Sequence, residues 1–67
     1  MEKILVLECE LISVRTRNAI VRNIKKVDKT KIVLSDVIDN IDRLRNKVKG
    51  IRTLNEINNL YNYLLKF

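Results

Sequence analysis

Residues 48–66, VKGIRTLNEINNLYNYLLK, carry the clearest helical pattern of the chain. Apolar residues recur there every three or four positions, which places them on one face of an α-helix. This apolar face consists of Leu54, Ile57, Leu60, Tyr61, Leu64 and Leu65. The polar residues Arg52, Glu56 and Asn59 fall on the reverse face. We predict a helix from about residue 52 or 53 to residue 66, beginning shortly after the only glycine, Gly50.

Two earlier segments repeat this spacing. Ser13 is a good N-cap for a helix over about residues 14–24. The predicted inner face of that helix holds Val14, Ile20, Val21 and Ile24. Ser35 is predicted to cap a second region, 35–47, which fits either one long helix or two short ones. The apolar residues expected to turn inward there are Val37, Ile38, Ile41 and Leu44.

The beginning of the chain differs, because residues 3–12 (KILVLECELI) contain too many adjacent apolar residues for a surface helix. We predict an extended arm or short strand over residues 1–12, followed by a helical domain at 13–67. The length of 67 residues is near the lower limit for folding on a hydrophobic core alone. The predicted fold class is all-α, a compact domain of four to five helices with an extended N-terminal arm. The single cysteine, Cys9, is expected to be a small packing residue.

The net charge of +6 is concentrated in two basic blocks. Residues 15–31 hold seven basic residues and one aspartate. The second block, at 43–52, contains Arg43, Arg45, Lys47, Lys49 and Arg52. Such blocks indicate either a charged face that meets a polyanion or a lysine-rich solvated surface, and charge alone favours neither.

The segment around Gly50 gives a more specific signal. Glycine adopts left-handed backbone angles without penalty and lets another molecule approach the chain closely. Unpaired N–H groups at the following helix start attract a phosphate, to which Arg52 adds charge and Thr53 a hydroxyl. This pattern is typical of a helix–hairpin–helix turn on a DNA backbone. A glycine that simply ends the preceding helix also fits it.

Two motifs, in the right order and spacing, resemble the C-terminal domain of the bacterial RNA polymerase alpha subunit. SVRTRNAI at 13–20 resembles that family's (S/T)-V-R-(S/T)-x-N-C-L, and VKGIRTLNEI at 48–57 resembles its N-L-G-x-K-S-L-x-E-I. LSDVI at 34–38 is similar to its V-G-D-L-L, so the similarity covers about residues 8–66. The resemblance implies a compact four-helix domain with a helix–hairpin–helix-like motif. In that family the domain binds the minor groove of A·T-rich DNA and contacts transcription factors.

The resemblance also implies which residues bind DNA. The family's principal DNA-contacting arginine matches Arg15, and the narrow, strongly negative minor groove of A·T tracts favours an inserted arginine. We expect Glu56 to orient Arg15 or Arg52 through an ion pair, and the short Ala19 to let the groove come close. The whole expected DNA-binding set is Arg15, Asn18, Ala19, Gly50, Arg52, Thr53 and Glu56. The expected secondary phosphate contacts are Arg22, Lys25, Lys26 and Lys49.

Some positions depart from the family pattern. Ala19 stands where the family has cysteine, Arg17 where it usually has an apolar residue, and Lys49 where it has leucine. Val48 is therefore expected to fill the core place before the glycine. The connector after the first helix is several residues longer than in the family and rich in lysine.

Catalytic function finds little support in the sequence. The chain has no histidine, a single cysteine and no glycine-rich phosphate loop, so we expect no catalytic residue, no metal ligand and no cofactor. Asp36, Asp39 and Asp42 recur every three residues and drift around a helix instead of converging on a metal. No apolar run approaches the roughly 18 residues of a membrane span, and we expect a cytoplasmic protein that contacts no membrane.

Three functions are weighed against one another. The first is a DNA-binding transcription module, either a piece of a divergent alpha subunit or a small protein carried by a phage, virus or plasmid. The second is a protein-interaction module, a regulator or decoy that engages RNA polymerase or a transcription factor. The third is a structural homo-oligomer that pairs through the apolar arm. Arg15, Asn18, Gly50 and Arg52 together favour the first, whose partner is A·T-rich double-stranded DNA.

Overall fold

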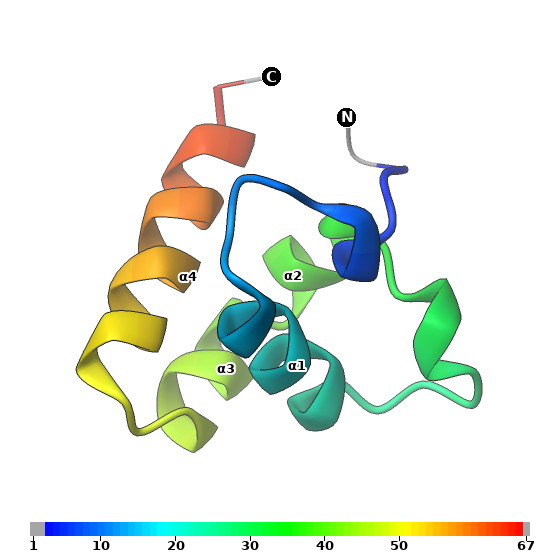
Figure 1. Cartoon of the computed structure of the whole chain (residues 1–67), viewed down its shortest axis with the longest axis horizontal. Coiled ribbons are helices and arrows are strands. Elements are labelled where there is room, and N and C mark those ends of the chain that lie inside the picture. The colour runs from blue at the N-terminus through cyan, green and yellow to red at the C-terminus, as the bar shows by residue number, and fades with distance from the viewer. Residues whose placement is uncertain (1–2, 67) are drawn as a thin grey trace.

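Four α-helices and two short 3₁₀ turns make up the computed structural model, which describes residues 3–66 (Figure 1). In chain order they are η1 Val6–Glu8, α1 Val14–Asn23, η2 Lys29–Lys31, α2 Leu34–Asp39, α3 Ile41–Lys47 and α4 Ile51–Leu64. No strand occurs among residues 3–66, where the β-type pairing is one isolated bridge between Leu5 and Val33. The chain is a compact all-α domain of four helices, which confirms the predicted class.

Helix α1 begins where the sequence predicts, after the Ser13 cap, whose Oγ accepts a hydrogen bond from the Thr16 N–H at 3.3 Å. Ile20 and Ile24 are buried, as predicted. Val14 is 63% exposed, however, and Thr16 takes the inner place in the first turn. The prediction for Val14 is wrong because the Thr16 hydroxyl donates to the Glu56 carboxylate of α4 at 2.7 Å, which turns the threonine inward.

The middle region forms two short helices, α2 and α3, which are separated at Asn40. The cap of α2 is Val33 and not Ser35 as we predicted, because the Asp36 carboxylate accepts the Val33 N–H at 2.9 Å. The inward turn of Val37, Ile41 and Leu44 is confirmed, since all three are buried.

The N-terminal segment was expected to be an extended arm, but the described part of it, residues 3–12, packs onto the helices. Val6, Cys9 and Ile12 are at most 4% exposed and belong to the core. Two backbone hydrogen bonds of 2.8 and 2.9 Å join the segment to residues 32–34. The interpretation of Cys9 as a packing residue is confirmed. The adjacent apolar residues of this segment therefore reflect burial in a 3₁₀ turn and its flanking loops.

Helix α4 closes the core with Ile57, Leu60 and Leu64, while Leu65 is 56% exposed. The two ends of the described chain lie at the upper edge of Figure 1. The α3–α4 turn, α1 and the connector that follows α1 lie along the lower edge. This arrangement brings the start of α4 next to α1, although 36 residues separate Val14 from Gly50 in the sequence.

Candidate nucleic-acid interface

A groove of about 370 Å³ runs between the outer face of α1 and the turn that joins α3 to α4. It brings together five of the seven residues expected to bind DNA, namely Arg15, Asn18, Ala19, Gly50 and Thr53. The other residues that line it are Arg22, Asn23, Lys47, Val48 and Lys49. The sequence analysis did not assign Lys47 to the site, although it lies in the second basic block. We call this concavity the basic groove.

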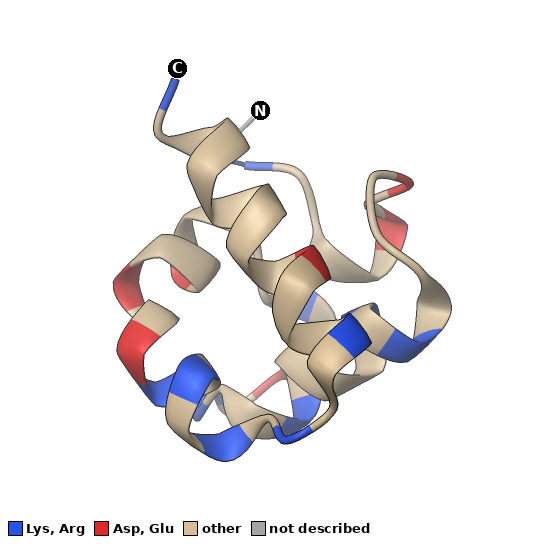
Figure 2. Ribbon diagram, turned by 90° about the vertical axis from the view of Figure 1, so that its left-hand side faces the viewer, with Lys and Arg blue, Asp and Glu red and all other residues tan. Residues whose placement is uncertain are grey.

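The basic groove is strongly positive. Its lining includes the cations Arg15, Arg22, Lys47 and Lys49 and no carboxylate. Figure 2 shows Lys and Arg concentrated toward the lower end of the molecule, where α4 begins. A concave surface with one sign of charge focuses the electrostatic field and raises the local concentration of a counter-charged ligand. The groove is therefore suited to a polyanion.

The arginines that do not line the basic groove and its edge are engaged within the protein. Arg17 Nε donates to a backbone carbonyl at 2.5 Å, and Arg43 Nε donates to the carbonyl at the end of α1 at 2.8 Å. Arg45 Nε donates to Asn58 Oδ1 at 2.9 Å, and its guanidinium lies 5.2 Å from the centroid of the Tyr61 ring. These three side chains hold loops and helices together.

The remaining arginines, Arg15, Arg22 and Arg52, behave differently. All three are exposed and form no hydrogen bond or ion pair within residues 3–66. Arg15 and Arg22 line the basic groove, and Arg52 lies in an adjacent hollow with Arg15, Ser13, Val14 and Glu56. Arg15 borders both concavities. The unengaged guanidinium groups therefore lie along one edge, and their five N–H donors each remain available to an external anion.

Glu56 bonds to α1 where we predicted an ion pair with Arg15 or Arg52, and Arg15 acts on its carboxylate only as a nearby charge. Its carboxylate accepts hydrogen bonds from the Ser13 N–H at 2.8 Å, the Ser13 Oγ at 3.0 Å and the Thr16 Oγ1 at 2.7 Å. No ion pair within 4.0 Å joins it to Arg15 or Arg52 in the described part of the chain. Glu56 therefore caps α1 from α4 and fixes the two helices relative to each other. The hydrogen bond from the Thr16 hydroxyl, and next the one from the Ser13 N–H, hold the pKa of Glu56 below its ordinary value.

Gly50 does not adopt the left-handed backbone that we considered for it. Its φ of −76° and ψ of 127° are accessible to any residue, and it is the N-cap of α4. A Cβ built on it lies 3.6 Å from Thr53 Oγ1, which is ordinary van der Waals contact. What the glycine provides is an uncovered backbone. No side chain caps α4, and its first backbone bond is from the Leu54 N–H to the Gly50 carbonyl at 2.9 Å.

Of the expected secondary contacts, Arg22 and Lys49 line the basic groove, whereas Lys26 is engaged elsewhere. The Lys26 ammonium pairs with the Asp36 carboxylate at 3.0 Å and also donates to the Lys31 carbonyl. Lys25 is exposed and lies beyond the end of α1, outside the basic groove. Asp36, the partner of Lys26, lies ten residues away in the sequence. The sequence alone therefore provides no reason to treat Lys26 differently from Lys25.

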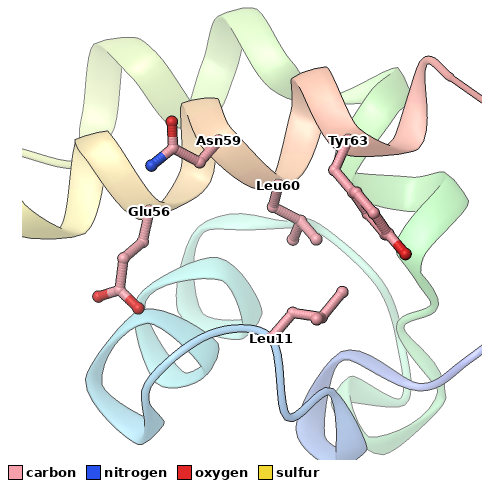
Figure 3. A pocket seen from close by; sticks show the side chains of 5 residues that line it. All are labelled: Leu11, Glu56, Asn59, Leu60 and Tyr63. Carbon is pink, nitrogen blue, oxygen red and sulfur yellow. The ribbon is translucent and has the colours of Figure 1, made fainter.

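A further hollow lies beside the C-terminal half of α4. Leu11, Glu56, Asn59, Leu60 and Tyr63 line its volume of about 210 Å³ (Figure 3). Leu60 lies at its base and is 3% exposed, while Leu11 at its rim is 56% exposed. We call it the Leu11 hollow. No sequence pattern indicated this hollow, because Leu11 lies in a segment that we expected to be an arm.

The chain matches no known protein family, no curated protein and no solved structure at a significant level. The resemblance to the alpha-subunit domain is therefore not shown by these comparisons. None of the helices in residues 3–66 is long and apolar enough to cross a membrane.

Proposed function

We propose that this chain is a non-enzymatic DNA-binding transcription module, similar in its mode of binding to the C-terminal domain of the RNA polymerase alpha subunit. One observation carries the proposal. The basic groove gathers four cations and no carboxylate from two segments distant in sequence; its two arginines, Arg15 and Arg22, are unengaged, and the unengaged Arg52 lies in the adjacent hollow. Electrostatic attraction to phosphates supplies most of the affinity of proteins for DNA.

In this proposal Arg15 enters the minor groove of A·T-rich DNA, whose narrow width deepens its negative potential. Asn18 is exposed one turn farther along α1, and its amide makes no hydrogen bond within the described residues. It is positioned to bond to a sugar or phosphate. Half-buried Ala19, next to Asn18 on the groove wall, leaves room for the DNA backbone because its side chain is short.

A second contact forms at the start of α4. The N–H groups of residues 51–53 have no carbonyl partner, because the first helical bond is made by the Leu54 N–H. They carry the positive end of the helix dipole and attract a phosphate oxygen. Exposed Arg52 adds a charge beside them, and Thr53 borders the basic groove. The uncovered backbone of Gly50 allows the phosphate to approach.

The test is the affinity for an A·T-rich duplex and a G·C-rich duplex of equal length, each measured over a salt series. We expect tighter binding to the A·T-rich duplex and affinity that falls as salt rises, with a log–log slope of about −0.9 per phosphate contact. Arg15→Ala is expected to abolish most of the binding. Lys66→Ala removes the same charge at the far end of the chain and serves as the control. Equal affinities of the two variants would show that Arg15 does not read the groove.

A protein-interaction module that engages RNA polymerase or a transcription factor is the second candidate, and the Leu11 hollow favours it. Large apolar side chains that are exposed around a concavity often mark protein-binding sites. The candidate predicts that the chain binds purified RNA polymerase without DNA and that Leu11→Arg weakens this binding. The Arg15→Ala variant would then bind the polymerase as tightly as the parent chain.

A further inference from the structure

The connector between α1 and α2, residues 24–33, contains the short turn η2 and is internally braced by hydrogen bonds. The Lys29 ammonium donates to the Ile24 carbonyl, and the Lys26 ammonium donates to the Lys31 carbonyl at 3.1 Å. The Asp28 carboxylate accepts from the Thr30 N–H at 3.0 Å and from the Thr30 hydroxyl at 2.6 Å. These bonds give the connector a defined shape.

The bracing divides the four lysines of the connector into two pairs. Lys26 and Lys29 are the tethers, because their ammonium groups are bonded within the protein. Lys25 and Lys31 are exposed, and their ammonium groups have no partner within residues 3–66. The connector therefore presents two unengaged cations on a shaped loop. Its one acid, Asp28, is occupied by Thr30.

Lys25 lies just beyond the outer face of α1. Arg15, Asn18 and Arg22 follow one another at intervals of three and four residues on that face. Helix α1 ends at Asn23, and Lys25 follows the extended residue Ile24. In Figure 1 the α3–α4 turn, α1 and the connector lie along the same lower edge of the molecule. At 1.5 Å per residue, the eight residues from Arg15 to the end of α1 at Asn23 place the connector about 12 Å from Arg15.

We propose that the connector is a second phosphate-binding point on the same duplex, with Lys25 and Lys31 as its contacts. The inference rests on the proposed DNA binding. Helix α1 then lies along the duplex, and the connector contacts the backbone about four base pairs from Arg15, since each base pair rises about 3.4 Å. Val27, which is fully exposed between the two lysines, shows that no other part of the described chain covers this surface.

Two double variants with equal net charge test the proposal. Lys25→Gln/Lys31→Gln removes the connector cations but leaves the tethers Lys26 and Lys29 in place. Lys3→Gln/Lys66→Gln removes two exposed cations at the other edge of the molecule. We expect the connector variant to flatten the log–log salt slope by about 1.8, the value for two phosphate contacts, and the control variant to keep the parent slope. Equal slopes for the two variants would overturn the proposal.

A series of duplexes that extend by single base pairs to either side of an A·T-rich core gives a second readout. The affinity of the parent chain is expected to rise in a step when the duplex extends about four base pairs beyond the Arg15 contact on one side. The connector variant should show no such step, and length profiles that coincide would overturn the proposal. If the parent chain binds no duplex, the proposed function itself fails. If the parent binds and Arg15→Ala does not, the proposed function holds, and the salt slopes and length profiles report on the connector alone.

Discussion

The starts of α1 and α4 are neighbours in the fold, but only the start of α1 is capped by side chains of the protein. The first turn of α1 is capped within the protein by Ser13 and by the Glu56 carboxylate. The first turn of α4 has no side-chain cap, no acidic residue and a glycine at the N-cap position. An α-helix leaves its first N–H groups without partners, and capping residues normally supply them. The comparison indicates that α1 is positioned by the protein itself, whereas α4 is open to an external anion.

Glu56 links the two sites, because it lies on α4 but gives its carboxylate to α1. The one acid of α4 borders the adjacent hollow but does not line the basic groove, and the lining of the groove keeps its positive charge. Chains that bind anions at a helix start need such a separation, since a carboxylate near the N-terminus competes with the ligand.

The largest expected effect follows removal of the internal cap. Glu56→Ala leaves the Ser13 N–H and the buried Thr16 hydroxyl without their acceptor, which costs about 1–3 kcal/mol of the free energy of unfolding. Urea denaturation measures the loss. Asn55→Ala, one residue away on the exposed face of α4, is the control and is expected to change the free energy by less than about 0.5 kcal/mol. Equal effects of the two variants would contradict the capping role.

The same cap is expected to have a smaller effect on how the stability of the fold depends on pH. The hydrogen bonds from Thr16 and Ser13 hold the pKa of Glu56 below its ordinary value of 4.5 in the folded chain. As the pH falls, the unfolded chain therefore takes up this proton first. The stability from Glu56 is complete above about pH 4.5 and is lost as the pH falls through the lower folded-state pKa. Glu56→Gln should reduce the slope of stability against pH in that window, and an unchanged slope would refute it.

Asp28 and Asp36 also contribute to the loss of stability at acidic pH. Glu56→Gln is therefore expected to reduce the slope of stability against pH and not to remove it. The Thr30 hydroxyl and N–H lower the pKa of Asp28. For Asp36, burial is the largest single influence and raises the pKa, but the Val33 N–H and Lys26 together outweigh it and lower the pKa. Asp28→Asn, which leaves both helix starts unchanged, is the matched control for the attribution to Glu56.

The contrast between the two helix starts also explains what the sequence could predict. The positions of α1 and α4 follow from local signals, the Ser13 cap and the apolar period, and both are confirmed. The juxtaposition of Arg15 with Gly50 followed from two motifs and their spacing. The cap from Glu56 depends on a contact across 40 residues, which no local pattern specifies. For the same reason the sequence did not show which arginines are engaged, because their carbonyl partners are set by tertiary packing.

A cap introduced at α4 is expected to separate stability from binding. Gly50→Asp places a carboxylate at the N-cap, where its backbone angles are compatible, and should stabilise the fold by about 0.3–1 kcal/mol. The same change should weaken DNA binding strongly, because the carboxylate occupies the N–H groups and repels the phosphate. Gly50→Asn, an uncharged cap, should stabilise similarly and weaken binding less. Thermal unfolding and duplex titration measure the two effects, and unimpaired binding by Gly50→Asp would exclude a phosphate at α4.

The smallest change is Gly50→Ala, which adds one methyl group to the open helix start. The protein has room for it, since the new Cβ meets Thr53 Oγ1 at 3.6 Å and the backbone angles suit alanine. Alanine is a poorer N-cap than glycine but restricts the unfolded chain, and these effects offset each other to within about 0.5 kcal/mol. A phosphate that contacts the backbone here would meet the methyl group, so we expect weaker duplex binding at unchanged stability. Full affinity in Gly50→Ala would mean that the DNA does not approach α4 closely, and the open start of α4 would then act through its charge alone.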